Sequence, residues 1–369
     1  MIKKIKRLDL SKQWISQEKK ILPSILKVLR SGQYVNSDIV KKLENKIARL
    51  NNTKYCICTN SGTDALTLGL HALGIKKNDE VITQSNSFIA SAASIVHLGA
   101  KPVFVDIKNN QMIDEDKIQL KITKKTKAIM PVHLTGRMAN MKIIKKIAKK
   151  NNLKIIEDCA QAIGSKYSGK YSGTYGDIGC FSAHPLKNLN ACGDGGFVIL
   201  NDKKKYEYIK KLTNHGLIDR NLCETFGYVS RMDAIQASIL NERIKYLKSV
   251  IKKRRFIAKL YFEKLQKLPI DLPLEEKFEF NTYHLFVIRT KKREKLIKYL
   301  RLKGIETGIH YPIPIHKQQA YKNLFKNSLE LNRTEKQAKE ILSLPINEFL
   351  KKNEIIYTCN MIKAFFNEN

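Results

Sequence analysis

One lysine of this chain stands apart from the rest. Lys187 follows the β-rich run Gly179–Ser182 and precedes the glycine-rich turn Gly193–Gly196. The chain has 55 lysines, yet Lys187 is the only one between Tyr171 and Asp202. A lone lysine is more often a solvated side chain, but the isolation of this one just past a predicted strand favours a chemical role. Its amine is of the type that forms a Schiff base with a carbonyl group.

A carboxylate ends another predicted strand. In the run Ile155–Gln161, two isoleucines lead into Glu157 and Asp158. Burying an unpaired carboxylate is costly, so Asp158 needs a partner. It is equally consistent with an aspartate that caps the following turn and with one that pairs with a cation supplied by a ligand.

The segment Asn60–Leu66 comes after a predicted strand and opens a predicted helix. Gly62 allows close approach of the backbone, and the free N–H groups at a helix start attract anions. Thr63 and Asp64 also suit ordinary positions in a helix cap and first turn. The segment therefore predicts either a phosphate cradle or a plain helix start.

Together, an anion cradle, an acid and a lysine are what pyridoxal 5′-phosphate requires, since the acid pairs with its pyridine nitrogen and the lysine with its aldehyde. The glycine fingerprint of a dinucleotide site is absent after the first strand, and the P-loop motif is absent too. We therefore predict a pyridoxal 5′-phosphate site.

Alternating strands and helices must position these residues. A largely parallel sheet with both faces covered follows from this alternation, and its ligand site should lie beyond the carboxyl ends of the strands. We expect helices over Gly62–Leu73, Phe88–Leu98 and Met141–Lys150. Strands are expected over Tyr55–Thr59, Glu80–Gln84, Pro102–Ile107, Ala128–Leu134, Leu153–Asp158, Ile178–Ser182 and Gly196–Asn201.

The pattern changes after about residue 250, and a break with two prolines follows at Leu268–Leu274. We expect a large domain over residues 1–250 and a smaller α+β domain over residues 251–369. Helices at Lys20–Arg30 and Ile39–Leu50 should pack across the join. In the smaller domain we expect a strand over Asn281–Arg289 and helices over Lys292–Lys303 and Glu335–Leu344.

The composition narrows the class of protein. The net charge of +34 suggests nucleic acid as a partner, but the lysines are spread along helical stretches rather than gathered in one arm, so we expect no such partner. The seven cysteines include no C-x-x-C pair, so neither a metal site nor a disulfide framework is expected. No apolar run is long enough for a membrane span, and residues 1–14 lack the apolar core of a signal peptide. We expect a soluble, cytoplasmic protein that does not bind membranes.

Several motifs resemble those of the DegT/StrS-type nucleotide-sugar aminotransferases, from Gly32 to Asn347. The resemblance implies the fold-type I architecture of aspartate aminotransferase. It also implies a homodimer with active sites at the subunit interface and glutamate as amino donor. The motifs are SGTDAL (Ser61–Leu66), GAKPVFVDI (Gly99–Ile107), KAIMPVHLTG (Lys127–Gly136), IIEDCAQAIGSKYSGKYSGTYGDIGCFSAHPLKNL (Ile155–Leu189) and HYPIPIH (His310–His316).

The resemblance assigns roles to individual residues. Lys187 would form the Schiff base, Asp158 would pair with the pyridine nitrogen, and His184 would support the active site. Without the resemblance, the histidines of HYPIPIH are equally consistent with a plain surface loop. The other implied contacts are Phe88 stacked on the ring, Gln161 beside its oxygen, Gly62, Thr63 and Ser182 around the phosphate, and Tyr34, His310, Tyr311 and His316 at the sugar nucleotide.

The sequence differs from the family pattern at one contact, and it is most similar to one branch of the family. The family often has Asn reaching the partner's cofactor phosphate where Val229 and Ser230 stand, so this contact is absent or falls to Ser230. The run His184–Gly196 is most similar to the branch acting on dTDP-linked 3-keto-6-deoxyhexoses, which make amino sugars for surface polysaccharides or glycosides. A UDP-linked or 4-keto acceptor, and a non-catalytic cofactor-binding regulator, stay open. Lys187 argues against the dehydrating relatives, which have histidine there.

Overall fold

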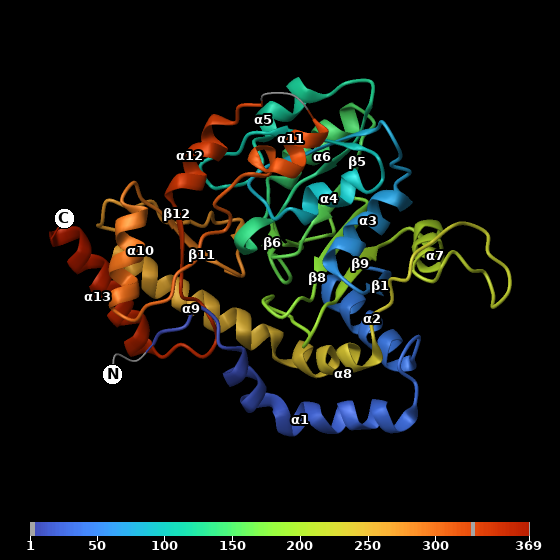
Figure 1. Ribbon diagram of the computed structural model, residues 1–369, viewed down its shortest axis with the longest axis horizontal. Coiled ribbons are helices and arrows are strands. Elements are labelled where there is room, and N and C mark those ends of the chain that lie inside the picture. Colours follow the sequence, from blue (N-terminus) through green and yellow to red (C-terminus); the bar gives the residue numbers. More distant parts are fainter. Residues whose placement is uncertain (1–3, 326–328, 369) are drawn as a thin grey trace.

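The computed structural model describes residues 4–325 and 329–368. At its centre lies a seven-stranded sheet in the order β1-β9-β8-β5-β4-β2-β3 (Figure 1). All neighbours are parallel except β9, which runs antiparallel to both β8 and β1. The strands are β1 (Tyr55–Thr59), β2 (Glu80–Gln84), β3 (Lys101–Val105), β4 (Thr126–Met130), β5 (Lys154–Asp158), β8 (Ile178–Ser182) and β9 (Gly196–Leu200).

Both faces of this sheet are buried, which explains why its strands are apolar without alternation. Along β8, Phe181 packs with Leu43 on one face, whereas Cys180 packs with Leu66 on the other. The predicted mostly parallel, doubly covered sheet is therefore confirmed. The helices are α1 (Leu10–Ser31), α2 (Asp38–Asn51), α3 (Gly62–Ala72), α4 (Ala90–Val96), α5 (Glu115–Ile118), α6 (Met141–Lys150), α7 (Lys203–Leu212), α8 (Ala234–Arg243), α9 (Leu247–Leu265), α10 (Arg293–Leu302), α11 (Gln319–Leu324), α12 (Asn332–Glu340) and α13 (Lys352–Glu368).

A second core forms around the last third of the chain. Strands β11 (Phe286–Arg289) and β12 (Ile341–Leu344) pair antiparallel and pack with α9, α10 and α13. Helix α9 runs through residue 250, so the chain passes toward this core within one continuous helix. A small sheet of β6 (Lys166–Tyr167), β7 (Lys170–Tyr171) and β10 (Glu279–Phe280) joins the two parts.

The N-terminal segment also spans the two cores. Helix α1 lies against α8 along the lower edge of Figure 1. At its start, the Gln13 amide donates to both Asn190 Oδ1 and Glu348 Oε1, each at 3.2 Å. Gln13 at the start of α1 thus contacts residues of both parts of the chain.

The predicted helix over Glu335–Leu344 is wrong in its second half, since α12 ends at Glu340 and β12 follows. Periodicity cannot separate a helix from a strand in so short an apolar run. Pairing with β11, more than 50 residues earlier in the chain, makes Ile341–Leu344 a strand. The strand predicted over Asn281–Arg289 also begins only at Phe286, because Leu285 N–H bonds to Thr135 O instead.

None of the described helices has the length and apolar character that crossing a membrane requires. All seven cysteines are free thiols, and five of them are buried. The thiols therefore contribute to stability through packing, as small apolar groups.

Glu44 on α2 should make stability depend on pH. Its Oε1 accepts the Cys58 N–H at 2.8 Å, and burial raises the pKa of this carboxyl from 4.5 to about 7. The unfolded chain then releases the proton at lower pH than the folded chain, so folding stability is present at acidic pH and decreases as pH rises from 4.5 to 7. We expect Glu44→Gln, which keeps the acceptor oxygen, to remove about 2–3 kcal/mol of this decrease.

Urea unfolding at several pH values measures the effect. Glu207→Gln on α7 is a matched control, because Glu44 and Glu207 line one pocket between α2 and α7 and Glu207 is exposed. An unchanged pH profile in Glu44→Gln would contradict the prediction.

Candidate active site

A cavity of about 480 Å³ opens beyond the carboxyl ends of β5 and β8, at the start of α3. Residues of the C-terminal part, including His284, His310 and Tyr311, close its other side. The structure brings ten of the predicted site residues to this one cavity. They are Gly62, Thr63, Phe88, Asp158, Gln161, Ser182, His184, Lys187, His310 and Tyr311.

The start of α3 is built for an anion. Ser61 Oγ accepts the Asp64 N–H at 3.0 Å, which leaves the N–H groups of Gly62 and Thr63 without a partner among the described residues. A Cβ on Gly62 would lie 2.7 Å from Ser182 Cβ, and one on Gly196 would lie 2.3 Å from Ser61 O. Glycine at both positions therefore lets the helix start approach β8 and β9, and its free donors suit a phosphate.

Asp158 ends β5 as a buried carboxylate that can accept a further hydrogen bond. Its Oδ2 accepts from Ser91 Oγ at 2.7 Å and its Oδ1 from Ala160 N–H at 3.1 Å. The carboxylate thus caps the following turn and also lines the cavity. Within the described part of the chain, no cation comes within 4 Å of it, so a protonated ring nitrogen fits as its partner.

Lys187 lies in the loop after β8, with its N–H bonded to His184 O at 2.9 Å. Burial lowers the pKa of its amine, whereas the nearby Asp158 carboxylate opposes this shift. Both residues line the cavity without forming a direct ion pair in the described part of the chain, which leaves space between them. An amine with a lowered pKa is readily neutral, as a nucleophile or base must be.

Four further side chains surround this space. Gln161 accepts the Thr135 N–H at 2.7 Å and donates to the Tyr311 hydroxyl at 3.2 Å. The rings of Phe88 and Tyr311 are tilted by 43° to each other, with centroids 5.7 Å apart. His184 Nδ1 accepts the Leu186 N–H at 3.3 Å, and burial lowers the pKa of its ring. These contacts fix the walls of the cavity before any ligand arrives.

Two predicted substrate contacts lie elsewhere. His316 is buried between Ser85 Oγ at 2.7 Å and Glu335 Oε1 at 3.0 Å, so its ring fastens the loop after β2 to α12. Tyr34 is half exposed between α1 and α2, where its hydroxyl donates to Leu29 O. Ser230, suggested as a replacement for a contact across subunits, is fully buried and accepts the N–H of Asn60 in its own chain.

Sequence analysis missed four residues that line the cavity or hold it. Ser91 supports Asp158, and Arg7, Asp194 and His284 lie on the wall. The glycine-rich turn Gly193–Gly196 could have pointed to Asp194, whereas no local pattern marks Ser91, Arg7 or His284. Arg7 in particular lies far from every motif that predicted the site.

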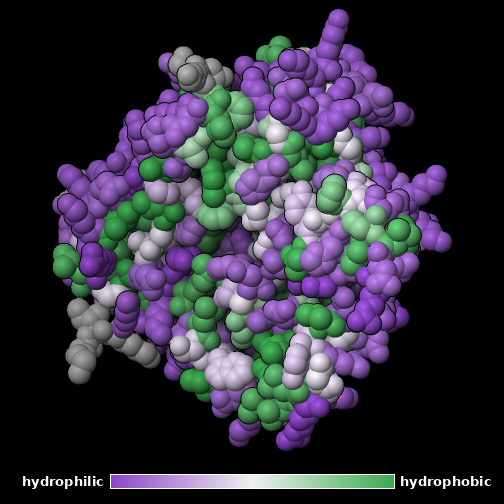
Figure 2. Space-filling model, turned by 45° about the vertical axis from the view of Figure 1, so that its right-hand side comes forward, coloured by the Kyte–Doolittle hydropathy of each residue, from purple (hydrophilic) through white to green (hydrophobic). Residues whose placement is uncertain are grey.

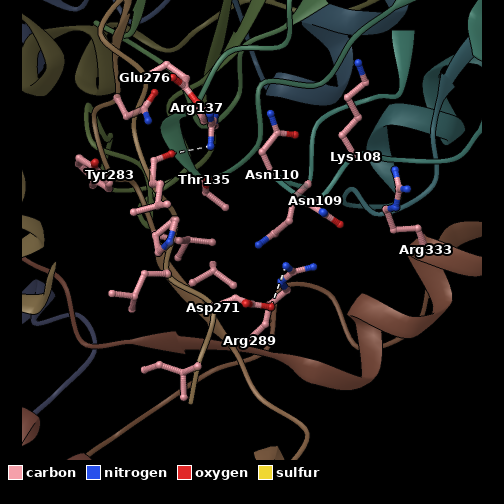
Figure 3. A pocket seen from close by; sticks show the side chains of 18 of the residues that line it. Lys108, Asn109, Asn110, Thr135, Arg137, Asp271, Glu276, Tyr283, Arg289 and Arg333 are labelled. Carbon is pink, nitrogen blue, oxygen red and sulfur yellow. Dashed lines mark hydrogen bonds and ion pairs between the residues drawn. The ribbon is translucent and has the colours of Figure 1, made fainter. Parts of the chain in front are cut away.

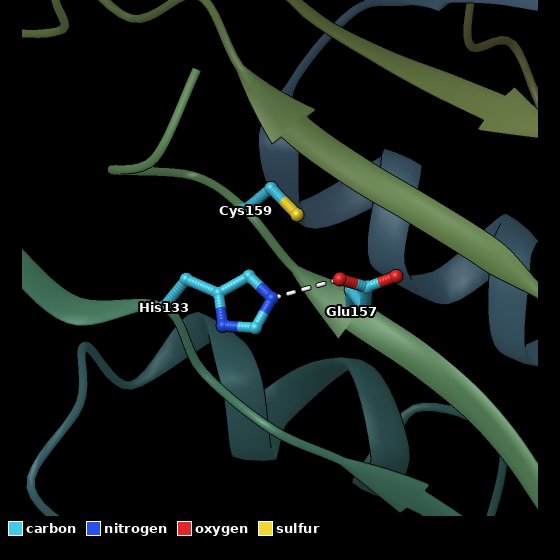
Figure 4. Close-up of side chains that lie close together, drawn as sticks. All are labelled: His133, Glu157 and Cys159. Atoms are coloured by element: carbon cyan, nitrogen blue, oxygen red, sulfur yellow. Dashed lines mark hydrogen bonds and ion pairs between the residues drawn. The ribbon is translucent and has the colours of Figure 1, made fainter. Parts of the chain in front are cut away.

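A second cluster near the site is structural. His133, Glu157 and Cys159 lie side by side behind the end of β5 (Figure 4). His133 Nδ1 accepts the Ala139 N–H, so Nε2 carries the proton that faces Glu157 Oε2 at 2.9 Å. Glu157 also accepts N–H groups of the loop 173–176, so the donor atoms of this cluster are already engaged. These hydrogen bonds hold the loop 173–176 against β5. They occupy the His133 and Glu157 atoms that a metal ion would need as ligands.

A larger cleft of about 790 Å³ lies between the loop 108–116 and the segment 266–289. Its cations are already paired, as Figure 3 shows for Arg289 and Asp271, which lie 2.8 Å apart. Arg137 is paired with Glu279 at 2.9 Å, and Lys108 with Glu115 at 2.8 Å. This cleft therefore lacks the unpaired groups that distinguish the smaller cavity.

The sequence matches the model of the DegT/DnrJ/EryC1/StrS aminotransferase family over residues 16–363. The chain belongs to this family. The predictions of the family, of the fold and of a pyridoxal-phosphate-dependent transaminase are thus confirmed.

Several relatives of this chain are named for a nucleotide sugar, whereas two carry regulatory or sensory names. The chain is 42% identical to the dTDP-3-amino-3,6-dideoxy-alpha-D-galactopyranose transaminase of Aneurinibacillus thermoaerophilus, covering 94% of this chain and 96% of the relative. It is 36% identical to the UDP-N-acetyl-3-dehydro-alpha-D-glucosamine 3-aminotransferase of Acidithiobacillus ferrooxidans, covering 97% of each. The pleiotropic regulatory protein of Geobacillus stearothermophilus is 40% identical, covering 97% of this chain and 98% of the relative.

Solved structures of the family agree with the fold. DesV of S. venezuelae, in complex with a ketimine intermediate, superposes with a TM-score of 0.96 at 34% identity and 98% coverage of both chains. NtdA of Bacillus subtilis, with bound cofactor PMP, gives 0.93 at 32% identity, covering 100% of this chain and 86% of that one. The relatives named above for dTDP and UDP sugars are nucleotide-sugar aminotransferases.

Proposed function

We propose that this protein transfers the amino group of glutamate to a dTDP-linked 3-keto-6-deoxyhexose, for a surface polysaccharide or glycoside. The observation behind the proposal is one cavity that joins Lys187, Asp158 and the free N–H groups of α3. The run His184–Gly196 supports the 3-keto branch, as does the relative that is 42% identical.

Pyridoxal phosphate, when bound, supplies a carbonyl carbon for amine exchange and a ring that takes up electrons during proton transfer. The N–H groups of Gly62 and Thr63 would hold its phosphate, and Asp158 would keep the ring nitrogen protonated. Phe88 is positioned to cover the ring.

Lys187 is the residue that would move the proton. With the cofactor and the amino donor bound, its amine would lie beside the donor's α-carbon in a buried site. The lowered pKa keeps the amine neutral enough to accept the α-proton, and the resulting ammonium then returns it. Both half-reactions need a proton to be moved at the carbon that carries the amine. Lys187 can therefore serve the amino donor and the sugar in turn.

The second proposed partner is another copy of this chain. Figure 2 shows a face that is hollowed near its centre, with a largely hydrophilic rim and apolar residues around the hollow and near the lower edge. Exposed apolar side chains lie on α1, including Leu22, Leu26 and Leu29, and in the loop 217–229. Phe226 in this loop is 96% exposed, which is costly unless another surface covers it.

We expect Phe226→Asp to weaken the homodimer by about 30-fold or more, because it replaces apolar burial with a buried charge. Sedimentation equilibrium measures the dissociation constant. Leu120→Asp is the matched control, because Leu120 is also strongly exposed but lies outside this surface. Equal dimer affinity in the two variants would contradict the proposed interface.

A substrate panel tests the function. The purified protein with glutamate is offered 3-keto and 4-keto sugars linked to dTDP or UDP, and products are read by mass spectrometry. We expect the amine on the dTDP-linked 3-keto sugar. The UDP-linked relative makes a UDP sugar the second candidate, and faster amination of one would replace the proposal.

The regulator alternative predicts a different result. If the protein were a non-catalytic regulator, it would bind cofactor without turning over any sugar in the panel.

We assign the protein to the cytoplasm, since nucleotide sugars are made there and seven free thiols suit a reducing compartment.

A further inference from the structure

The residues before α1 hold Arg7 in a fixed place. Ile5 N–H donates to Gly304 O at 2.8 Å, and Ile5 O accepts the Glu306 N–H at 3.0 Å. The Asn347 amide then donates to the carbonyls of Lys6 and Arg7, at 3.1 and 3.2 Å. These bonds position the backbone of Arg7 independently of any ligand.

The side chain of Arg7 reaches the wall of the active-site cavity. It passes over Gly308, where a Cβ would lie 3.3 Å from Arg7 Cδ and Nε. The same Cβ would lie 3.0 Å from His310 Cε1, so glycine makes room for both side chains. Arg7 therefore lies beside His310 at the cavity.

The Arg7 guanidinium lacks a carboxylate partner. Among the described residues, no acidic oxygen lies within 4 Å of it, and Glu306 Oε2 accepts the Arg7 backbone N–H instead. The arginines of the larger cleft are paired, for example Arg289 with Asp271. A partly buried arginine stays charged, so an unpaired one at a cavity favours an anionic ligand.

The neighbours of Arg7 leave it as the available cation. Burial lowers the pKa of His310 to about 4 and that of His284 well below its usual range, so both rings are neutral. Lys187 and Arg7 each contribute to these shifts by charge repulsion, which places both cations near the same two histidines. Arg7 and Lys187 thus line the same cavity and share His284 and His310 as neighbours.

We propose that Arg7 binds the α-carboxylate of the amino donor. The inference rests on the proposed transaminase function. The donor's α-carbon must come within reach of Lys187, and its carboxylate is one bond further on, so the carboxylate needs a cation close to that lysine. The planar guanidinium fork matches a carboxylate through two parallel hydrogen bonds. The diphosphate of the sugar nucleotide is the competing anion, but C2, C1 and the glycosidic oxygen separate its first phosphorus from the reacting C3.

The test compares Arg7→Met with the wild type and with Lys6→Met. Lys6 is the neighbouring cation, but it faces solvent and pairs with Asp9, so its loss controls for net charge. Glutarate, an unreactive dicarboxylate, is titrated by calorimetry. Conversion of the holoenzyme by glutamate and its return by the keto sugar are followed separately by absorbance.

We expect Arg7→Met to weaken glutarate binding and to raise the half-saturating glutamate concentration by about 30- to 100-fold. Lys6→Met and the sugar half-reaction should change less than about threefold, and Arg7→Lys should recover part of the loss. Unchanged glutarate affinity in Arg7→Met would overturn the inference, as would a loss confined to the sugar half-reaction, which would assign Arg7 to the diphosphate.

Failure of the proposed function gives a different result. A wild-type protein that binds glutarate through Arg7 but aminates no sugar refutes the sugar substrate and keeps the carboxylate site. A wild-type protein that aminates the sugar but does not bind glutarate refutes the carboxylate site alone.

Discussion

Lys187→Ala is expected to abolish transamination and to leave the protein folded. The side chain is needed twice, to bond to the cofactor and to move the α-proton, and proton transfer alone contributes about 10²- to 10⁴-fold to a rate. We therefore expect kcat to decrease by at least about 10⁴-fold. Borohydride reduction of the wild type should fix the cofactor to a peptide that contains Lys187, as read by mass spectrometry.

The control for this variant is Lys203→Ala, at the exposed start of α7. It should keep both turnover and the reduced label on Lys187. If Lys187→Ala kept a covalently reduced cofactor on another residue, the assignment of Lys187 would be wrong.

Asp158→Asn has the second largest expected effect. Asparagine keeps the shape and can still accept the Ala160 N–H through its oxygen, while its amide N–H can donate to the Ser91 hydroxyl oxygen. It removes the charge that would keep the ring nitrogen protonated. We expect kcat to decrease by about 10³-fold, in the range of other preorganised electrostatic contacts. Steady-state kinetics with glutamate measures the loss, and thermal unfolding verifies the fold.

Ser91→Ala separates charge from position at the same carboxylate. It removes one hydrogen bond to Asp158 Oδ2 but leaves the charge, so we expect a loss of about tenfold or less. Near-normal turnover in Asp158→Asn would contradict the pairing role. An equal loss in both variants would mean that the position of the carboxylate matters more than its charge.

The relation between β5 and β8 explains how a sequence can predict an active site. The two strands are parallel neighbours, with Asp158 opposite Cys180. Residues that follow parallel neighbours lie at one edge of the sheet, so Asp158 and Lys187 come together although they are distant in the chain. The start of α3 joins them because Gly62 and Gly196 allow close backbone approach.

The same reasoning fails for residues that no strand end positions. His316 belongs to a motif with His310 and Tyr311, yet its ring is directed to Ser85 and Glu335 rather than to the cavity. Arg7 belongs to no motif and lies on the cavity wall. The direction of a loop side chain depends on packing against segments far away in the sequence.

For this protein, the sequence by itself determined the apolar strands, the helix that starts at Gly62, and the family motifs around Asp158 and Lys187. These features depend on local side-chain patterns and on the sheet geometry that such patterns impose. Only the tertiary structure decided that Ile341–Leu344 is a strand, that Ser91 supports Asp158, and that Arg7 faces the cavity unpaired. Each of these depends on pairing between distant segments, whose free energy no local window of residues contains.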